Sequence, residues 1–408
     1  MQQQLILLTE GFPFGKTETF LETEILYLSK HFQHIHIIVI NPESKILREV
    51  PSNCSIYIIN HKENWHHKVS SLVYLFYPIF YKEIKIIKYT YKKKITYGII
   101  KTMLMGIYRA KIIKQYIEEK FNLNVNNDLV FYSYWCDDSA LGLSLLKTKY
   151  PSNKYISRIH RWDLYFEESK YNYISFRHYI NCKLNLIVSI SEDGVTYCRN
   201  KWLIPNPEKI IIHKLGIKKQ ILLPINNSII IVSCSNLIPV KRVDLIVQSL
   251  SILTEYTFKW VHFGDGPEMQ KIKKLSQNIL NNNNVSWELK GNVKNSEIMK
   301  WYINDIPSLF INLSLSEGIP VSIMEAMSFG IPVIATDVGG TSEIVNNKNG
   351  YLISENASIE EVKSLICGYL TLTDYEKNLK KNAAYKTWEN SYNAEINYTK
   401  FCNLITKL

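Results

Sequence analysis

Residues 314–345 have the sequence SLSEGIPVSIMEAMSFGIPVIATDVGGTSEIV, and this stretch decides the fold that we predict for the chain. The apolar run Leu309–Leu313 just before it predicts a β-strand, and Ile319–Phe329 predicts a helix that ends at Gly330. Val333–Thr336 is short and apolar, so it predicts a second strand. A strand–loop–helix–strand unit of this kind is typical of a parallel sheet covered by helices.

The same alternation of short apolar strands and helical stretches extends outward from this unit in both directions. The first half of the chain predicts strands at Leu5–Leu8, His36–Ile40, Ile56–Ile59, Leu129–Ser133, Tyr155–Arg158 and Leu186–Ile190. The second half predicts strands at Ile229–Ser233, Phe258–Phe263, Val285–Leu289, Leu309–Leu313 and Val333–Thr336. Two such series indicate an α/β protein with two doubly wound, Rossmann-like domains that face each other across a cleft. We place these domains at 1–222 and 223–385, followed by a helix at 386–408 that packs back on the first domain.

Two glutamates, Glu317 and Glu325, lie eight positions apart around the start of the predicted helix. Pro320 suits the first turn of that helix, and the free N–H groups of a helix start attract anions. Carboxylates make poor phosphate ligands, but they accept hydrogen bonds from hydroxyl groups. The combination predicts a site for a nucleoside diphosphate sugar, with sugar hydroxyls on one side of the diphosphate and ribose hydroxyls on the other.

The two glutamates are embedded in the string EG-x-P-x4-EAM-x2-G-x-PV-x-AT-x-VGG-x2-E. This string resembles the signature of the retaining glycosyltransferase family 4, which has the two-domain GT-B fold. The likeness continues through VSCSNLIPVKRVDLIVQSL (232–250), VHFGDGPEMQKI (261–272) and LKGNVKNSEIMKWY (289–302). TEGFPFGKTETFLETEI (9–25), RIHRWDLY (158–165), SISEDG (189–194) and LGI (215–217) resemble the family more loosely. The resemblance therefore covers nearly the whole chain.

The resemblance implies a role for each residue that matches the family pattern. Glu317 would hold hydroxyls of the transferred sugar, Lys241 would contact the departing diphosphate, and His160 would lie beside the reacting sugar. The donor would be bound by Gly15, Lys16, Arg242, Gly318, Ile319, Pro320, Glu325, Asn292 and Val293, with Glu325 on the ribose. Acceptor contacts would come from Trp162, Asp163 and Tyr165, which could instead simply pack the end of a strand. No metal site and no cofactor are predicted, because the adjacent aspartates in CDDSA (136–140) lack the pattern of a metal-binding transferase.

Three places depart from the family pattern. Ser235–Leu237 stands where the family commonly has a G-R-L string, so one phosphate-binding guanidinium is missing and Arg242 or Lys16 could replace it. Arg161 follows His160 where the family usually has glycine. Lys16 follows Gly15 where paired glycines are common. These differences concern the geometry of donor binding rather than the class of protein.

The net charge of +11 is concentrated in residues 82–114, which hold ten Lys and Arg but one acidic residue, Glu83. Basic residues among Ile, Tyr and Met predict an amphipathic helical pair on an anionic membrane surface. A solvated basic face over a buried apolar stripe is an equally good interpretation. Nucleic-acid binding is disfavoured because no nucleic-acid motif accompanies the segment. The glutamates at 18, 22 and 24 are predicted to form a polar helix face.

The predicted location is cytoplasmic, with possible peripheral attachment to the inner face of the cell membrane. The seven cysteines are far apart, the N-terminus has no basic signal-peptide region, and no apolar run reaches the ~20 residues that span a bilayer.

The predicted function is a retaining, metal-independent glycosyltransferase. It would move a sugar from a UDP or GDP sugar to a glycan acceptor, expected to be lipid-linked, during assembly of lipopolysaccharide, capsule or exopolysaccharide. One alternative is another GT-B enzyme such as a sugar-nucleotide epimerase, which would act on the donor without an acceptor. A second is a non-catalytic nucleotide-binding or scaffold subunit of a glycan-assembly complex.

Overall fold

The computed structural model describes residues 3–15, 17–42, 44–60, 65–123, 129–226, 228–280 and 284–408. It divides the chain into two compact units. Unit 1 comprises Met1–Gly216 and Ala394–Leu408, and unit 2 comprises Ile217–Asn393. Among the helices of the described residues, none is both long and apolar enough to cross a bilayer.

Unit 1 is built on a seven-stranded sheet whose strand order is β3-β2-β1-β4-β5-β6-β7. The strands are β1 (Gln4–Thr9), β2 (His34–Ile40), β3 (Cys54–Ile59), β4 (Leu129–Ser133), β5 (Lys154–Ile159), β6 (Leu186–Ser189) and β7 (Ile210–Ile212). The α-helices are α1 (Leu21–His31), α2 (Trp65–Ser70), α3 (Pro78–Lys85), α4 (Tyr97–Lys120), α5 (Asp138–Lys149), α6 (Arg177–Lys183), α7 (Glu192–Tyr197) and α14 (Ala394–Thr406). Short 3-10 helices are η1 (Ser71–Phe76), η3 (Phe166–Glu168) and η5 (Pro207–Lys209), and π-helical turns are η2 (Ile86–Thr90) and η4 (Cys198–Trp202).

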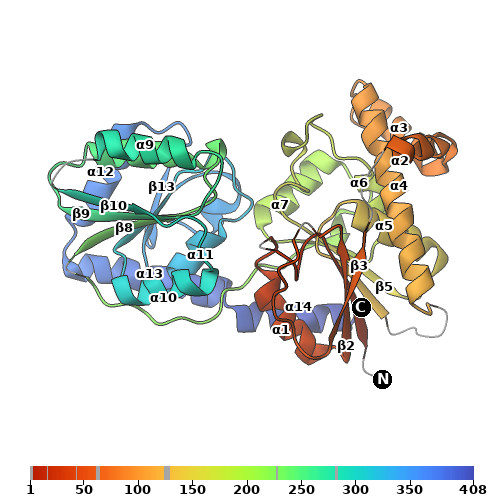
Figure 1. Cartoon of the computed structure of the whole chain (residues 1–408), viewed down its shortest axis with the longest axis horizontal. Coiled ribbons are helices and arrows are strands. Elements are labelled where there is room, and N and C mark those ends of the chain that lie inside the picture. The colour runs from red at the N-terminus through yellow and green to blue at the C-terminus, as the bar shows by residue number, and fades with distance from the viewer. Residues whose placement is uncertain are drawn as a thin grey trace. The chain divides into compact units, whose positions relative to one another are not determined.

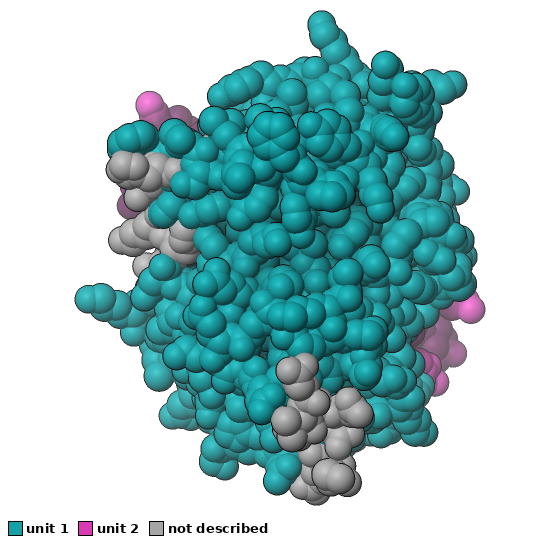
Figure 2. All heavy atoms as spheres, turned by 90° about the vertical axis from the view of Figure 1, so that its right-hand side faces the viewer, with its two compact units in different colours: residues 1–216, 394–408 teal, residues 217–393 magenta. Residues whose placement is uncertain are grey.

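All strand pairs in this sheet are parallel, and apolar cores cover both of its faces. Helices α1 and α14 pack on one face, where Tyr27 and Tyr398 place their ring centroids 5.5 Å apart. Helices α4 and α5 cover the other face together with α3 and α6 (Figure 1). Figure 2 turns the side of unit 1 that carries α2, α3 and α4 toward the viewer.

Unit 2 is built on a six-stranded parallel sheet with the order β10-β9-β8-β11-β12-β13. The strands are β8 (Ile229–Cys234), β9 (Phe258–Phe263), β10 (Val285–Leu289), β11 (Leu309–Asn312), β12 (Val333–Thr336) and β13 (Gly350–Ile353). The helices are α8 (Val243–Ser251), α9 (Met269–Ile279), α10 (Asn295–Asp305), α11 (Val321–Ser328), α12 (Ile359–Leu370) and α13 (Asp374–Ser391), with the 3-10 helices η6 (Pro239–Lys241) and η7 (Gly339–Glu343). Figure 1 shows α9 and α12 on one face of the sheet and α10 and α13 on the other. The predicted class, two doubly wound Rossmann-like domains, is confirmed.

The unit boundaries differ from those that we placed from the sequence, 222/223 and 385/386, for a visible reason. Ile217 donates its N–H to the carbonyl of Tyr392 at 2.8 Å and accepts a hydrogen bond from the indole of Trp388 at 3.1 Å. Together with the hydrogen bond that the Tyr385 hydroxyl donates to the Gln220 carbonyl at 3.1 Å, these bonds tie the segment to α13, and therefore to unit 2. The predicted final helix, 386–408, is two helices: its first residues complete α13, whereas α14 packs against α1 in unit 1.

Candidate functional site

The strand order of unit 2 reverses at β8, whose neighbours are β9 and β11. Ligands of doubly wound sheets bind at such a switch point, at the carboxyl ends of the strands. Lys241 lies in η6, on the connection that follows β8, and Glu317 lies on the connection that follows β11. The Lys241 ammonium donates a hydrogen bond to a carboxylate oxygen of Glu317 at 2.6 Å. The structure therefore brings these two candidate residues together where a ligand is expected.

Glu317 is held on several sides. The Asn312 side-chain amide donates to the same carboxylate oxygen at 3.3 Å, and Glu317 is 7 % exposed. The glycine pair of the opening sequence packs against the same loop: a Cβ on Gly339 would lie 1.9 Å from the Glu317 carbonyl oxygen. Gly340 donates its N–H to the Gly318 carbonyl at 2.9 Å. Gly339 also has a φ of 51°, so glycine is needed there for its conformation as well as for space.

Helix α11 begins at Val321, two residues later than predicted, and Pro320 is its N-cap residue rather than part of its first turn. The Pro320 carbonyl accepts from Ile323 N–H at 3.2 Å. Gly318, Ile319 and Pro320 are buried in the connection that leads from Glu317 to the helix start. The start of α11, with its first N–H groups, therefore comes shortly after Glu317 in the chain. A phosphate-binding helix start would have this position relative to the Lys241–Glu317 pair.

Glu325 lies on α11 and is 9 % exposed. Its carboxylate accepts a hydrogen bond from the Asn295 side chain, at the start of α10, at 2.6 Å. Burial raises the pKa of Glu325 to about 7, an effect that the Asn295 hydrogen bond opposes. Sequence reasoning missed Asn295, because only the folded structure brings the start of α10 next to α11. Asn292, which is exposed, and Val293, which is half-buried, lie on the loop that leads into α10.

The Arg242 side chain is already hydrogen-bonded within unit 2 and is not free to bind a phosphate. Its Nε donates to the Leu313 carbonyl at 2.6 Å, and its Nη1 donates to the Glu355 carbonyl. The guanidinium therefore joins two loops of unit 2, which weakens the idea that it replaces the missing arginine at 236. Lys16, the other candidate for that role, lies outside the described residues.

Glu18 has a role that the sequence did not indicate. It was predicted to be part of a polar helix face, but it precedes α1 and is 8 % exposed. Its carboxylate accepts from the backbone N–H groups of Glu10 at 3.0 Å, Gly11 at 2.8 Å and Phe12 at 2.5 Å. It also accepts from the indole N–H of Trp135 at 2.6 Å. The polar-face prediction is wrong for Glu18 because the loop after β1 folds around its carboxylate.

The polar-face prediction is also wrong for Glu24, which is buried and ion-paired with Arg158 at 2.8 Å. Tyr132 donates a further hydrogen bond to Glu24 at 3.0 Å. Of the three glutamates, Glu22 is the one at the surface, where it pairs with Arg48. Gly15, predicted to lie near the donor, has a φ of 67° and donates its N–H to the Ile46 carbonyl at 2.8 Å.

His160 directly follows β5, as predicted, and lies in an aromatic cluster. Its ring centroid is 4.4 Å from that of Trp135 and 4.6 Å from that of Tyr134. Neither ring nitrogen has a hydrogen-bond partner among the described residues. Burial, with a smaller contribution from the Arg158 charge, lowers the pKa of His160 well below its usual value. The imidazole is therefore neutral near pH 7, and it can donate one hydrogen bond and accept another.

The three candidate acceptor residues have different environments. Trp162 is 42 % exposed, and its ring lies 5.1 Å from that of Trp135. Asp163 is buried and accepts the backbone N–H groups of His160 and Cys136, each at 2.7 Å, so it fixes the ends of β5 and β4. The Tyr165 hydroxyl donates to Asp193. Of the three, only Trp162 is largely exposed, and its ring packs on Trp135, which also contacts His160.

No group of three or more His, Cys, Asp or Glu side chains is placed to hold a metal ion in the part of the chain that the structure describes. The adjacent aspartates have other roles: Asp137 accepts from the N–H of Ser139 at 2.8 Å at the start of α5, and Asp138 pairs with Arg109.

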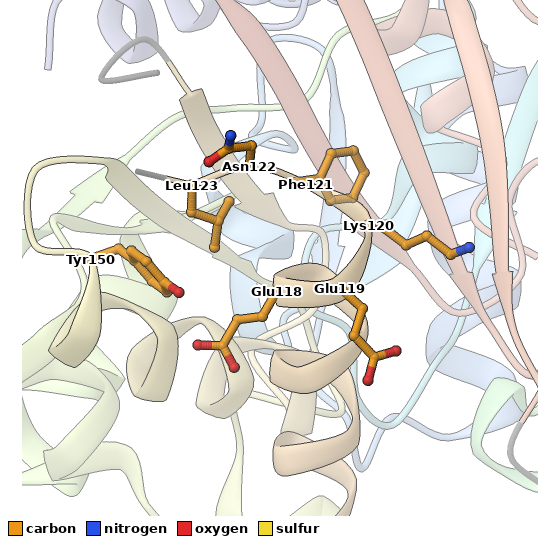
Figure 3. Close-up of a pocket in the computed structure, with 7 residues that line it drawn as sticks. All are labelled: Glu118, Glu119, Lys120, Phe121, Asn122, Leu123 and Tyr150. Atoms are coloured by element: carbon orange, nitrogen blue, oxygen red, sulfur yellow. The ribbon is translucent and has the colours of Figure 1, made fainter. Parts of the chain in front are cut away.

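A hollow of about 420 Å³ opens at the end of α4, and none of its lining residues is a predicted site residue. Its lining residues are Glu118, Glu119, Lys120, Phe121, Asn122, Leu123 and Tyr150 (Figure 3). Figure 3 shows Glu118 and Glu119 projecting from the last turn of α4, away from Phe121 and Asn122. The Glu118 carboxylate is already paired with Lys114 at 2.8 Å and Lys149 at 2.9 Å. Glu118 is therefore already engaged in ion pairs within unit 1.

The family model for glycosyl transferases group 1 matches residues 217–386. The match takes in both connections at the switch point of unit 2, and with them Lys241, Glu317 and Glu325. This part of the chain is therefore similar to the glycosyl transferases group 1 family, in agreement with the predicted enzyme class.

Three curated relatives are all glycosyltransferases. An uncharacterised glycosyltransferase of Methanocaldococcus jannaschii is 27% identical over 256 residues, covering 62% of this chain and 69% of the relative. The UDP-Gal:alpha-D-GlcNAc-diphosphoundecaprenol alpha-1,3-galactosyltransferase of Escherichia coli is 27% identical over 174 residues, 40% of this chain and 41% of that protein. The UDP-N-acetylglucosamine–peptide N-acetylglucosaminyltransferase GtfA subunit of Streptococcus agalactiae is 28% identical over 163 residues, 38% of this chain. The chain spans 30% of that subunit, so most of its length has no counterpart here.

Two solved structures share the fold along their whole length. Anabaena HepE in complex with UDP has a TM-score of 0.68 at 14% identity, with 100% of both chains covered. The sucrose-phosphate synthase of Thermosynechococcus elongatus has a TM-score of 0.72 at 14% identity, with 100% of this chain and 99% of the synthase covered. At this identity the likeness establishes the two-domain fold.

Proposed function

We propose that this protein is a retaining glycosyltransferase of family 4 that uses a nucleoside diphosphate sugar as its donor. The observation that carries the proposal is the Lys241–Glu317 pair at the switch point of unit 2. Together with the start of α11 it offers one cation for a diphosphate and one oriented carboxylate for sugar hydroxyls. Glu325 supplies a second carboxylate for the ribose. The likeness to Anabaena HepE in complex with UDP supports a uridine nucleotide donor.

The proposed reaction transfers the sugar with retention and without a metal ion. The bond between the anomeric carbon and the phosphate oxygen breaks, and the acceptor oxygen bonds to the anomeric carbon from the same face. The acceptor proton passes to the departing phosphate oxygen. Lys241 and the helix start stabilise the negative charge that collects on the diphosphate. His160, neutral and with both ring nitrogens buried without a hydrogen-bond partner among the described residues, would contact the reacting sugar.

We also propose a lipid-linked glycan acceptor at the inner face of the cell membrane, in assembly of a surface polysaccharide. The similarity to the UDP-Gal:alpha-D-GlcNAc-diphosphoundecaprenol alpha-1,3-galactosyltransferase of Escherichia coli supports such an acceptor. The concentration of lysines in residues 82–114 supports contact with anionic lipid.

A thermal-shift screen against UDP, GDP, ADP and their sugars tests the donor site. A true donor at 100- to 1,000-fold excess over its Kd should stabilise the protein by about 2.7–4 kcal/mol. Glu317→Gln and Lys241→Gln should reduce this shift, whereas Glu297→Gln, at an exposed position on α10, should leave it unchanged. No shift with any nucleotide would refute the donor site. Turnover of donor without acceptor would indicate an epimerase. Nucleotide binding without transfer, unaffected when Glu317 or His160 becomes alanine, would indicate a scaffold subunit.

A further inference from the structure

A stripe of exposed apolar side chains runs along α2 and η1 in unit 1. The exposed fractions are 65% for Trp65, 55% for Val69, 50% for Leu72, 63% for Val73 and 82% for Phe76. These residues recur at intervals of three and four along one helical segment, so they lie on one side of it. Single exposed apolar residues are ordinary, but a continuous stripe of this kind marks an interaction surface.

The opposite side of the same segment is already packed. Ser71 is 3% exposed, and the Tyr74 ring lies 6.2 Å from the ring of Tyr108 on α4. A surface helix normally presents apolar residues to the core and polar residues to water. Here apolar residues are on both sides, so the outer stripe contributes nothing to the core of unit 1 and calls for another explanation.

The surroundings of the stripe are strongly basic. Residues 65–101 contain eight lysines and one carboxylate, that of Glu83. Glu83 is 2% exposed and accepts hydrogen bonds from the Tyr173 hydroxyl and the Phe176 N–H, so it adds no negative charge to the surface. Lys82, Lys85 and Lys88 are exposed on α3 and η2, which continue directly from η1. Figure 2 looks onto this side of unit 1.

We propose that the α2–η1 stripe inserts into the interface of an anionic lipid bilayer, with the neighbouring lysines on its headgroups. Aromatic and aliphatic side chains flanked by lysines suit that environment. This proposal rests on the membrane location proposed above. It assigns insertion into the bilayer to α2 and η1 instead of to the apolar residues of the basic segment 82–114. Apolar residues of the predicted basic segment, such as Ile87, Met103 and Ile107, are fully buried in the core of unit 1 and cannot insert.

Co-sedimentation of the full chain with vesicles tests this surface. Vesicles of phosphatidylglycerol and phosphatidylcholine should bind the protein, and vesicles of phosphatidylcholine alone should bind it far less. Val73→Ser with Phe76→Ser should weaken binding to the anionic vesicles about tenfold or more. Lys85→Gln with Lys88→Gln should weaken it about fivefold per lysine. The matched control is Tyr375→Ser with Leu379→Ser on α13, which replaces residues of similar exposure, 73% and 52%.

Three outcomes overturn the proposal. The first is that the wild-type chain fails to bind anionic vesicles. The second is that it binds them and the Val73/Phe76 variant binds equally well. The third is that this variant abolishes a dimer in sedimentation velocity, which would show that a second copy covers the stripe. UDP stabilisation, measured on the same variants, reports separately on the donor site and on correct folding. Loss of vesicle binding with intact UDP stabilisation supports the surface. Vesicle binding without any nucleotide stabilisation would leave the surface standing and refute the donor site.

Discussion

Replacing Glu325 by glutamine should change how the affinity for UDP depends on pH. Burial raises the pKa of Glu325 from 4.5 to about 7, so the free protein holds a proton there over much of the range below neutrality. A ribose hydroxyl that donates to this carboxylate stabilises its ionised form and lowers that pKa. UDP binding should therefore release a proton, and affinity should rise as the pH rises through 7.

The size of the effect follows from the two pKa values. If the bound nucleotide returns Glu325 to its ordinary value near 4.5, only about one tenth of the free protein is ionised at pH 6. UDP should then bind about tenfold more weakly at pH 6 than at pH 8, which corresponds to about 1.4 kcal/mol. Glutamine keeps the size and the hydrogen-bond acceptor for Asn295 but cannot titrate, so this tenfold component should vanish.

Isothermal titration of UDP between pH 5.5 and 8.5 measures both quantities, because the proton release also appears as a dependence of the heat on the buffer. The diphosphate titrates in the same range, but it does so equally for wild type and Glu325→Gln. The difference between their pH profiles therefore isolates Glu325, and Glu297→Gln on the exposed side of α10 serves as the control. Parallel profiles for wild type and Glu325→Gln would show that the carboxylate does not contact the nucleotide, and the assignment of the ribose site would be wrong.

Three further substitutions test other parts of the reasoning. Lys241→Gln removes the cation paired with Glu317 and should lower the transfer rate about a hundredfold or more, measured as kcat. Arg158→Met leaves the Glu24 carboxylate buried without its partner and should cost about 3–5 kcal/mol in urea unfolding, most of which Glu24→Leu should restore. Gly339→Ala places a Cβ 1.9 Å from the Glu317 carbonyl and forces alanine into a φ of 51°, so it should cost about 1–3 kcal/mol of stability and weaken UDP binding.

The buried strands of both sheets could be predicted from the sequence because each is a short apolar run between turn residues. The strands that were missed are β7 and β13, which lie at the last position of each sheet. β7 is only three residues long, and β13 begins at Gly350 directly after the polar residues 346–349, which indicate a turn rather than a strand. The unit boundary was misplaced for a different reason, since it depends on Ile217 bonding to a helix that lies far along the chain.

In the candidate site, too, some residues could be predicted from the sequence and others could not. Lys241, Glu317 and Glu325 could be predicted because they lie within motifs that are local in the sequence. Asn295 and Trp135 could not, because each reaches its glutamate only through tertiary packing.

Each sheet has a glutamate at its switch point, Glu317 in unit 2 and Glu18 in unit 1, and the two carboxylates have different hydrogen-bond partners. In unit 2, Glu317 forms an ion pair with Lys241. Each of these side chains can replace the other by a ligand without leaving a backbone group unpaired. In unit 1, the switch point lies between β1 and β4, and Glu18 spans it from the loop after β1 to Trp135 after β4. The Glu18 carboxylate accepts hydrogen bonds from three successive backbone N–H groups of that loop. A phosphate bound there would need the same N–H groups. A diphosphate could bind there only by displacing a nearly buried carboxylate from four hydrogen bonds. In the proposed function the diphosphate therefore binds to unit 2. The loop after β1 keeps its conformation through Glu18, and Trp135 stays packed against His160.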